Sequence, residues 1–362
     1  MQGKRSAPHV FMAVLNWGLG HATRSCVLIE ALLRAGVRVS VGADGAALKL
    51  LHTEWPQLPI FELPAWHVSY PRRSMAWNML RLLPHFVHSM YADRRAIQKI
   101  HRQQCFDAVI SDNRYGCYLN ECPSILLTHQ LFIRSPWRWS DPWVHKYLHA
   151  WIRRFSACWV PDWPNAPGLS GALGHGQVSF PLRYVGPLSR MQACRVPNKR
   201  YEVAAILSGP EPQRTYLEQQ LIAQWFDLPL RGVLVQGLPE RQVRPCMLRP
   251  GLLQVPFLPK GPLNRLICES EVVVCRSGYS SLMDLAATGA KALLVPTPGQ
   301  TEQEYLAAQL AQKEICVVQS QATFNLAEGW QRARQLPGLG ALSKGDASLL
   351  DQAIAALLAQ LP

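Results

Sequence analysis

The stretch Glu271-Val-Val-Val-Cys-Arg-Ser-Gly-Tyr-Ser-Ser-Leu-Met-Asp-Leu-Ala-Ala-Thr-Gly-Ala-Lys-Ala-Leu-Leu-Val-Pro296 decides the fold class of this chain. It opens with an apolar, β-branched run that predicts a strand, and Ala292–Val295 predicts a second one. Between these runs, Leu282, Leu285 and Ala286 recur at helical spacing on one stripe. A strand, a helix and a further strand in this order are the repeating unit of a parallel sheet.

The same alternation of apolar runs and helix-period segments continues along all 362 residues. The other predicted strands are Val10–Leu15, Val37–Gly42, Asp107–Ser111, Ser124–Thr128, Ala157–Val160, Val203–Leu207, Gly232–Val235, Leu252–Val255 and Ile315–Val318. Helical segments between them, such as Ala22–Arg34, indicate an α/β fold with helices on both faces of parallel sheets. The pattern restarts after a break rich in Pro and Gly near 187–200. We therefore expect two doubly wound, Rossmann-like domains, 1–188 and 189–362. Whether the last helix packs back on the first domain stays open.

Composition indicates a globular protein with a basic first half. The chain is 48% hydrophobic and 17% charged, which excludes a disordered protein. Residues 1–190 hold 21 basic and 10 acidic side chains, a net charge of +11, and 10 of the 12 tryptophans lie before residue 164. A basic surface with tryptophan beside arginine suits an anionic partner, either nucleic acid or a membrane face.

Two segments, 75–91 and 137–154, combine apolar and aromatic side chains with arginine. They are expected to be either interfacial helices on a membrane or ordinary amphipathic helices with extended arginine side chains. No apolar run reaches the roughly 18 residues that span a bilayer, and no secretory signal is visible. Ten cysteines occur without a Cys-x-x-Cys pair. The sequence thus predicts a cytoplasmic protein with reduced thiols, with peripheral attachment to the inner face of the membrane left open.

Doubly wound sheets bind ligands beyond the carboxyl ends of their strands, and here the residues at those positions are polar. They are Asn16–His21, Asp112–Tyr115, His129–Gln130, Ser208–Arg214, Gln236–Gly237, Arg276–Ser281 and Thr297–Glu304. We therefore expect one polar cleft between the two domains.

In the second half, two turns combine glycine, hydroxyl groups and arginine at a predicted helix start. Ser208-Gly209 and Arg276-Ser277-Gly278 each close a strand, and backbone N–H groups at a helix start bind anions. Ser280 or Ser281 could equally be plain N-caps, and Ser281-Leu-Met-Asp284 fits a capping box. The two uses are compatible.

The carboxylate of Asp284 lies off the apolar stripe of its predicted helix. It could accept hydrogen bonds from a ribose diol, or it could only interact with the helix dipole. The run Thr297-Pro-Gly-Gln-Thr-Glu-Gln-Glu-Tyr305 carries amides and carboxylates that suit the hydroxyl groups of a sugar. Alternatively, this run is only a solvated turn followed by the start of a helix.

In the first half, three residues that follow predicted strands are candidates for proton transfer: His21, Asp112 and His129. His21 ends a glycine turn, and histidine titrates near neutral pH. His85-x-x-His88 and His145-x3-His149 have helix-face spacings without an evident carboxylate or cysteine partner, so no metal site is predicted. The sequence also lacks a P-loop, a complete dinucleotide fingerprint and a Gly-x-Ser-x-Gly elbow, which argues against ATPases, dehydrogenases and α/β-hydrolases.

These motifs together resemble a known family. Gly18-x-Gly20-His21 is similar to the N-terminal glycine loop of MurG-like transferases. Val272-Val-Val-Cys-Arg-Ser-Gly278, followed by Asp284 and Gln303-Glu304-Tyr305, resembles the C-terminal nucleotide-sugar site of glycosyltransferase family 28. The resemblance implies a GT-B fold, in which two Rossmann-like domains face a central cleft. It also implies an inverting transfer from a UDP-sugar without a metal or cofactor.

The resemblance further implies roles for individual residues. Backbone groups of Phe257 and Leu258 would contact uracil, and the serine and glycine turns would bind the diphosphate. The donor side would comprise Ser208, Gly209, Arg214, Phe257, Leu258, Arg276, Ser277, Gly278, Ser280, Ser281, Asp284, Gln300, Gln303 and Glu304. The acceptor side would comprise Asn16, Gly18, Gly20 and His129, with His21 as the first choice of base and Asp112 as the second. Gln303-Glu304 stands where the family commonly has two glutamines, which puts N-acetylglucosamine as the donor sugar in doubt. The first loop is also poorer in glycine than in the family, so acceptor contacts are expected to differ.

The leading hypothesis is therefore transfer to a lipid-linked or envelope-glycan acceptor at the inner face of the membrane. A nucleotide-sugar hydrolase or epimerase of the same fold stays open, as does a non-catalytic protein that binds a membrane or nucleic acid. Nucleic acid is the less favoured partner.

Overall fold

The computed structural model describes residues 7–65, 75–135, 138–194, 196–238, 244–342 and 348–361, with the backbone alone for residues 19, 75–84 and 138. The chain divides into two compact units. The first is Met1–Leu188 with Gly345–Pro362, and the second is Ser189–Lys344.

The first unit is built on a sheet of seven strands that all pair in parallel, in the order β3-β2-β1-β4-β5-β6-β7. Its strands are β1 (His9–Val14), β2 (Arg38–Ala43), β3 (Ile60–Glu62), β4 (Ala108–Asp112), β5 (Ser124–Leu127), β6 (Ala157–Val160) and β7 (Leu182–Tyr184). Its longer helices are α1 (Leu19–Arg34), α2 (Gly45–Glu54), α3 (Met75–Gln104), α4 (Asp141–Ile152) and α10 (Leu349–Leu358). The strand order reverses between β1 and β4, and this is the position where doubly wound sheets bind ligands.

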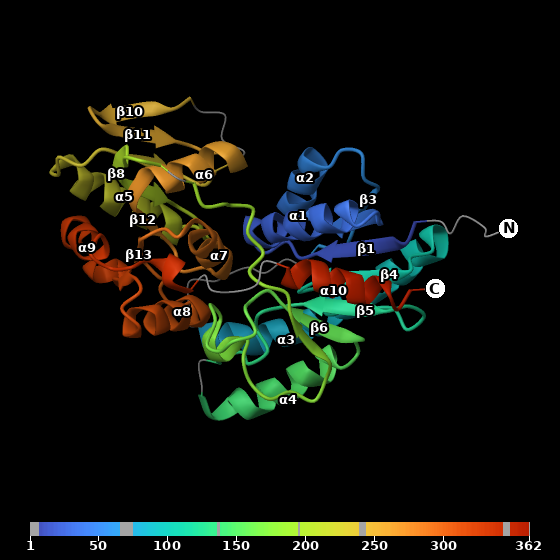
Figure 1. The fold of residues 1–362 in the computed structure, drawn as a ribbon. Coiled ribbons are helices and arrows are strands. Elements are labelled where there is room, and N and C mark those ends of the chain that lie inside the picture. Colours follow the sequence, from blue (N-terminus) through green and yellow to red (C-terminus); the bar gives the residue numbers. More distant parts are fainter. Residues whose placement is uncertain are drawn as a thin grey trace. The chain divides into compact units, whose positions relative to one another are not determined.

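Alternating side chains of each strand pack against helices on opposite faces of the first sheet. On β1, Phe11 and Ala13 belong to a buried cluster with Ile97 and Ile100 of α3. A second cluster joins Leu148 of α4 to β5 and β6. On the other face α1 contacts β1, β2, α2 and α10 (Figure 1). Both faces of the sheet are thus covered, as the apolar character of its strands requires.

The second unit repeats this plan with seven strands in the order β10-β11-β9-β8-β12-β13-β14. They are β8 (Tyr201–Ile206), β9 (Gly232–Val235), β10 (Cys246–Arg249), β11 (Leu252–Val255), β12 (Ser270–Cys275), β13 (Ala292–Leu294) and β14 (Val317–Val318). Its longer helices are α5 (Gln213–Phe226), α6 (Lys260–Glu269), α7 (Tyr279–Thr288), α8 (Thr301–Gln312) and α9 (Leu326–Ala333). Only β10, which pairs with β11, is antiparallel. The order reverses between β8 and β12.

The predicted fold class is confirmed, since both units are doubly wound α/β sheets. Every predicted strand corresponds to an observed one, with ends that differ by at most two residues. Three strands were not predicted, β3, β7 and β10, and each lies at the edge of its sheet. Helix α1 begins at Leu19 rather than at Ala22, so Gly20 and His21 belong to its first turn.

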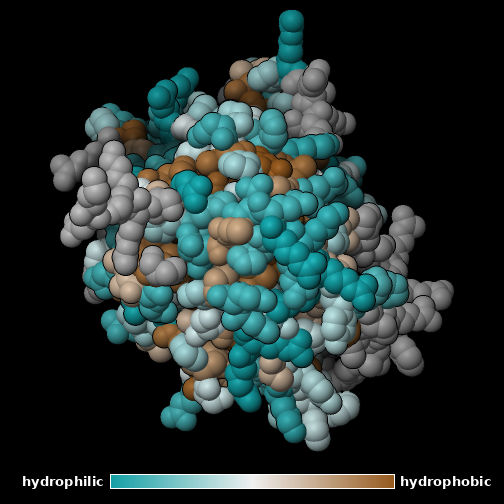
Figure 2. Space-filling model, turned by 90° about the vertical axis from the view of Figure 1, so that its right-hand side faces the viewer, coloured by the Kyte–Doolittle hydropathy of each residue, from teal (hydrophilic) through white to brown (hydrophobic). Residues whose placement is uncertain are grey.

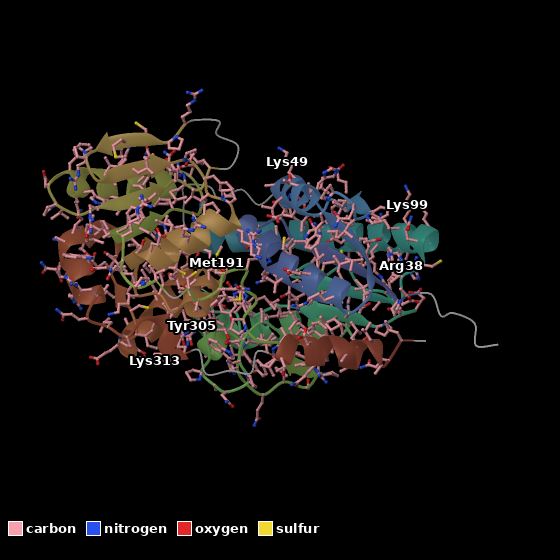
Figure 3. All side chains as sticks on the ribbon, turned by 45° about the horizontal axis from the view of Figure 1, so that its top comes forward. Arg38, Lys49, Lys99, Met191, Tyr305 and Lys313 are labelled. Atoms are coloured by element: carbon pink, nitrogen blue, oxygen red, sulfur yellow. The ribbon has the colours of Figure 1, made fainter. Side chains whose placement is uncertain are left out.

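Helices of the first unit expose basic side chains. Lys49 of α2 and Lys99 of α3 are exposed and point away from the ribbon (Figure 3). Over one face of the molecule hydrophilic side chains predominate, and hydrophobic ones gather mainly in a band near the top of the view (Figure 2). Among the residues with described structure, none of the helices combines the length and the apolar character that crossing a membrane requires.

Candidate active site

In the first unit, a histidine and an aspartate meet at the point where the strand order reverses. Asp112 is the last residue of β4, and His21 lies in the first turn of α1. The Nδ1 atom of His21 lies 2.9 Å from Oδ1 of Asp112. Gly18, the N-cap of α1, ends the short turn after β1, and its φ of 68° is a conformation that favours glycine.

Three donors besides His21 converge on the fully buried Asp112 carboxylate. Arg24 Nε donates to Oδ2 at 2.9 Å, and Ser25 Oγ donates to the same oxygen at 3.0 Å. Arg24 Nη2 donates to Oδ1. Burial would raise the pKa of Asp112, but Arg24 and His21 hold it well below its usual range. The carboxylate is therefore ionised throughout the physiological range of pH.

His21 is neutral at neutral pH and has one nitrogen available. Burial lowers its pKa, and the charge of Arg24 lowers it further against the attraction of Asp112. Nδ1 lies 2.9 Å from the Asp112 carboxylate, which needs a proton on Nδ1, and 2.8 Å from Nη2 of Arg24, which can only donate. Because Arg24 Nη2 also donates to the anionic Asp112, we assign the proton to Nδ1, which leaves Nε2 as an acceptor. Among the described residues no hydrogen bond engages Nε2, and the side chain is 15% exposed. His21 can therefore accept a proton from a bound hydroxyl group.

The other predicted acceptor-side residues have three different roles. His129 follows β5 and joins the site, because its Nδ1 lies 3.5 Å from Nη1 of Arg24. Asn16 instead holds the start of α2: its Nδ2 donates to Asp44 at 3.3 Å, and its Oδ1 accepts from the N–H of Ala47 at 3.3 Å. Gly18 and Gly20 shape the turn and the helix start.

The sequence interpretation missed the two residues of α1 that hold Asp112. Arg24 lies three residues after His21, one turn along the same helix, so helical spacing could have placed it in the site. The hydroxyl of Ser25 carries no comparable signal, because serine is common in helices without any ligand.

In the second unit, the start of α7 is an uncapped helix N-terminus. Gly278 is its N-cap and supplies no side chain, and no cap hydrogen bond forms. Among the described residues, neither the N–H nor the hydroxyl groups of Ser280 and Ser281 make a hydrogen bond within the chain. A Cβ atom built on Gly278 would meet nothing within 4 Å. Open space therefore faces backbone and hydroxyl donors, the combination that binds phosphate.

This geometry also excludes the capping box. The helix begins at Tyr279, so Ser281 lies inside it rather than at its N-cap. Asp284 lies beyond the first turn, where a carboxylate gains little from the helix dipole. Its Oδ1 instead accepts a hydrogen bond of 2.6 Å from Ser189 Oγ. Burial raises the pKa of Asp284 to about 6, although the Ser189 hydrogen bond opposes the shift.

The turn after β8 lies close to the turn after β13. Ser208 and Gly209 are exposed, and Gly209 has a φ of 100° that favours glycine. A Cβ atom on Gly209 would lie 3.7 Å from Oγ1 of Thr297. That oxygen is buried without a hydrogen-bond partner among the described residues, so a polar group of a ligand would satisfy it.

The two arginines predicted on the donor side are engaged by the chain. Arg276 is buried and donates to the carbonyls of Val295, Pro296 and Gln213 and to Oε1 of Gln321. Arg214 donates to Glu211 at 2.7 Å and to Glu218 at 2.8 Å. Both guanidinium groups therefore help to hold the strand ends together. The charge of Arg214 is compensated by two carboxylates, whereas the acceptors of Arg276 are all uncharged oxygens.

The predicted sugar loop is held by its own amides. Gln303 accepts from the N–H of Thr297 at 2.9 Å and donates to Gln300 at 2.5 Å. Glu304 accepts from the N–H of Gly299 at 2.9 Å. Ser277 Oγ donates to the carbonyl of Gln303 at 2.8 Å, which brings the starts of α7 and α8 together. The loop is thus preorganised, with unused valences left on its amide and carboxylate groups.

Phe257 and Leu258 follow β11, and both are half-buried. Within the described part of the chain, their backbone groups make no hydrogen bond. Such backbone groups are available to the edge of a base.

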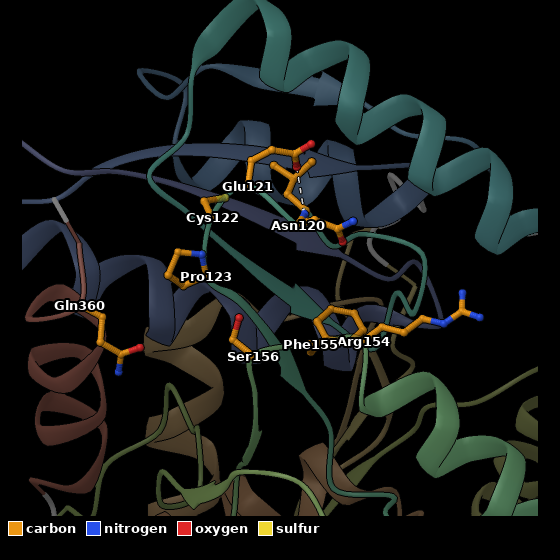
Figure 4. A pocket seen from close by; sticks show the side chains of 9 residues that line it. Asn120, Glu121, Cys122, Pro123, Arg154, Phe155, Ser156 and Gln360 are labelled. Carbon is orange, nitrogen blue, oxygen red and sulfur yellow. Dashed lines mark hydrogen bonds between the residues drawn. The ribbon is translucent and has the colours of Figure 1, made fainter.

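A surface hollow of about 450 Å³ lies elsewhere in the first unit (Figure 4). It is lined by Leu119, Asn120, Glu121, Cys122, Pro123, Arg154, Phe155, Ser156 and Gln360. Pro123 and Ser156 directly precede β5 and β6, so the hollow lies at the amino ends of these strands and not at the His21 site. Where side chains are described, no three His, Cys, Asp or Glu residues form a group that could hold a metal ion.

Comparisons with known proteins find glycosyltransferases. Residues 252–336 match the model of the glycosyltransferase family 28 C-terminal domain. The whole chain is similar to the glycotransferase of kitacinnamycin, with a TM-score of 0.71 and 16% identity over 99% of this chain and 100% of that one. For MurG from Acinetobacter baumannii the TM-score is 0.61 and the identity 15%, over 98% and 100%.

The spinosyn rhamnosyltransferase SpnG, in a structure with thymidine diphosphate, gives a TM-score of 0.59 and 16% identity over 97% and 92% of the two chains. No curated protein matches the sequence. The matched domain is that of a glycosyltransferase family, and the fold of the whole chain is one that glycosyltransferases use. The chain therefore has the GT-B fold of these glycosyltransferases, and residues 252–336 of its second unit match a family 28 C-terminal domain.

Proposed function

We propose that this glycosyltransferase moves a sugar from a UDP-sugar to a hydroxyl group of a lipid-linked or envelope-glycan acceptor, with inversion at the anomeric carbon. The observation that carries the proposal is the pairing of His21 with Asp112 at 2.9 Å, at the ligand-binding edge of the first sheet. A neutral imidazole held by a buried carboxylate is the arrangement that general-base catalysis of a hydroxyl attack requires.

The reaction is a single displacement. The acceptor oxygen forms a bond to the anomeric carbon while Nε2 of His21 takes its proton, and the bond between that carbon and the UDP oxygen breaks. UDP leaves with the electron pair, and the proton remains on His21. Asp112 stabilises the resulting imidazolium, and Arg24 keeps Asp112 ionised.

On the donor side we propose that the α7 N-terminus binds the diphosphate together with Ser208 and Gly209. Arg214 and Arg276 form part of the scaffold, so the partial positive charge of the helix end takes the role of a cation. On this basis the transfer proceeds without a divalent metal, and EDTA is expected to leave the rate unchanged.

We further propose that Asp284 accepts hydrogen bonds from the ribose and that the backbone of Phe257 and Leu258 contacts the base. Uracil is the base implied by family 28. The SpnG structure holds thymidine diphosphate, so thymine is the competing base. The loop of Gln300, Gln303 and Glu304 would meet the sugar.

The acceptor half of the proposal is supported by the basic, tryptophan-rich first unit. Lipid-linked and envelope-glycan acceptors occur at a negatively charged membrane surface, which attracts such a protein. We therefore propose that the enzyme works in the cytoplasm at the inner face of the membrane.

The decisive experiment is calorimetric titration of the full chain, without metal, with UDP, UDP-sugars and the matching dTDP and GDP compounds. Selective binding of UDP compounds that is lost in Asp284→Ala is expected. Equal binding of all three nucleotides would contradict the donor assignment, and no binding would contradict the transferase proposal. Release of free sugar from the bound donor in buffer, with no acceptor present, would favour the hydrolase alternative.

A further inference from the structure

Two cysteines of the second unit lie side by side, and the proposed reaction uses neither. Cys194 belongs to the segment 189–194, with which the second unit begins, and Cys268 lies in the last turn of α6. Both thiols donate to the backbone oxygen of Gln192, Cys194 at 3.5 Å and Cys268 at 3.6 Å. Because the two sulfur atoms share one acceptor, they are neighbours in space although they are far apart in sequence.

Asn264 of α6 holds the segment 189–194 against the helix. Its Nδ2 donates to Sγ of Cys194 at 3.0 Å, and its Oδ1 accepts from the N–H of Gln192 at 2.8 Å. Asn264 and Cys268 are four residues apart and therefore lie on the same face of α6. The two thiols are thus kept next to each other, and joining them requires no rearrangement of α6.

The two thiols differ in their access to solvent. Cys194 is exposed, whereas Cys268 is buried. Burial raises the pKa of Cys268 to about 11, and the hydrogen bond with the Cys194 thiol adds to the shift, while the charge of Lys199 opposes it. An oxidant in solution therefore meets Cys194 first, and Cys268 is placed to react with the product. By contrast, Cys275 and Cys316 are both buried, so such an oxidant reaches neither.

The segment 189–194 also contacts the carboxylate that we place on the ribose. Ser189 Oγ donates to Asp284 at 2.6 Å and accepts from the N–H of Met191 at 2.9 Å. Met191 is itself buried, so the segment is anchored between Ser189 and Cys194. A covalent bond at Cys194 would therefore restrain the hydroxyl group with which a ribose competes for Asp284.

We infer that Cys194 and Cys268 form a reversible disulfide that weakens nucleotide binding by the second unit. The oxidant is a low-molecular-weight disulfide, such as oxidised glutathione. The effect on nucleotide binding rests on the proposed role of Asp284, whereas the formation of the disulfide does not.

The reaction is a pair of thiol–disulfide exchanges. The Cys194 thiolate attacks one sulfur atom of the oxidant, forms a mixed disulfide and releases the first thiolate. The Cys268 thiolate then attacks Sγ of Cys194 and releases the second. Two protein thiols are thereby oxidised, the oxidant is reduced to two thiols, and the protons of the cysteines pass to these products. Dithiothreitol reverses both steps.

The test compares the reduced full chain with the chain treated with oxidised glutathione. After alkylation of the remaining thiols, peptide mapping by mass spectrometry should find a crosslink between Cys194 and Cys268 in the oxidised chain alone. Calorimetric titration should give a Kd for UDP that is about two- to tenfold higher after oxidation, the scale of one hydrogen bond that can no longer yield. Dithiothreitol should remove the crosslink and restore the Kd.

Two serine variants separate the pair from other thiols. Cys194→Ser changes an exposed side chain, so it should unfold at the wild-type temperature, form no crosslink and keep its reduced Kd after oxidation. Cys246→Ser, at an exposed cysteine of β10, is the matched control and should behave like the wild type.

Three results would overturn the inference: an oxidised wild type without the crosslink, a mixed disulfide that stays on Cys194, or a crosslinked chain with the Kd of the reduced one. Failure of the proposed donor site is a separate result, because reduced protein would then bind no UDP. In that case the presence or absence of the crosslink still supports or excludes the redox pair.

Discussion

At the scale of single residues, neighbouring charges decide what His21 can do. Arg24 and Ser25 fix the Asp112 carboxylate, and the carboxylate fixes the ring of His21. A histidine with a lowered pKa is unprotonated over a wider range of pH than a free one. The rate should therefore rise with pH as His21 loses its proton, and the midpoint of this rise should lie below pH 6.5, the ordinary pKa of histidine.

Replacing either partner should abolish most of the turnover. His21→Gln removes the base, and Asp112→Asn removes the anion that holds its proton on Nδ1. A positioned general base contributes about 10²- to 10⁴-fold, so kcat should fall by about that factor in both variants. The Kd for UDP should stay unchanged, because the proposed nucleotide ligands lie in the second unit. His88→Gln, on an exposed face of α3, is the control. A kcat within threefold of the wild type in His21→Gln would rule out His21 as the base.

The carboxylate of Asp284 should make donor binding depend on pH. Burial raises its pKa to about 6, and only the ionised form accepts hydrogen bonds from both ribose hydroxyls. Affinity for UDP should therefore be constant above about pH 7 and weaken by up to about tenfold per pH unit well below pH 6. Calorimetry between pH 5 and 8 measures this, and Asp284→Asn should remove the dependence.

Ser189 offers an independent readout of the same carboxylate. Its hydroxyl holds Oδ1 of Asp284 at 2.6 Å, so a ribose hydroxyl must share or displace it. Ser189→Ala should strengthen UDP binding and should raise the midpoint of its pH dependence, because a hydrogen bond that favours the ionised form is lost. A weaker affinity at every pH would mean that Ser189 positions Asp284 instead of competing for it.

At the scale of elements, the uncapped start of α7 should bind diphosphate through its backbone. Gly278 has a φ of −68° and open space around its Cβ position, so alanine fits there without strain. Gly278→Ala should change the free energy of unfolding by less than about 1 kcal/mol, the usual scale for an N-cap exchange. The added methyl group lies in the proposed phosphate space, so affinity for UDP should fall at least about tenfold while affinity for uridine stays the same. An equal loss for uridine would place the methyl group against the nucleoside and contradict the phosphate assignment.

The sequence predicts the central elements well and the sheet edges poorly, for a physical reason. Central strands such as β12 are buried on both faces, so they read as continuous apolar runs. Strands β3, β7 and β10 are half-buried or exposed edge strands of three or four residues, and their mixed composition gives no such signal. The sequence predicts the start of α1 at Ala22, after its true start at Leu19, because Leu19 and Gly20 follow a glycine and resemble part of the turn.

In the candidate site, features that depend on local sequence could be predicted, and contacts between residues far apart in sequence could not. The turn after β12 and the glycine start of α1 are local motifs, so their place at the strand ends could be predicted. The partner of Asp284 could not, because Ser189 lies 95 residues away in sequence. The hydrogen bonds of Arg276 could not be predicted either, since its acceptors lie in α5, at the end of β13 and on Gln321. Residue type identifies candidate ligand-binding side chains. Only the tertiary contacts show which of these side chains already have hydrogen-bond partners within the chain.

At the scale of the whole molecule, the chain leaves its first unit near residue 188 and returns to it at the end. Each unit has hydrophobic clusters of its own, and each of the described clusters lies within one unit. Helix α10 follows the second unit in sequence, but it packs on α1. Its Leu350, Ile354 and Leu357 are buried. The first unit is therefore complete only when the last helix is in place.

This organisation predicts that α10 stabilises the first unit without affecting nucleotide binding. Leu357→Ala removes a side chain that is 2% exposed and should cost about 2–5 kcal/mol of unfolding free energy in the first unit. Calorimetric unfolding should then show two transitions. UDP should raise the one that belongs to the second unit, and Leu357→Ala should lower the other, with an unchanged Kd for UDP. Leu326→Ala, in the core of the second unit, is the matched control and should lower the UDP-sensitive transition instead. If both variants lower one common transition by similar amounts, the two units unfold together and α10 stabilises the whole chain.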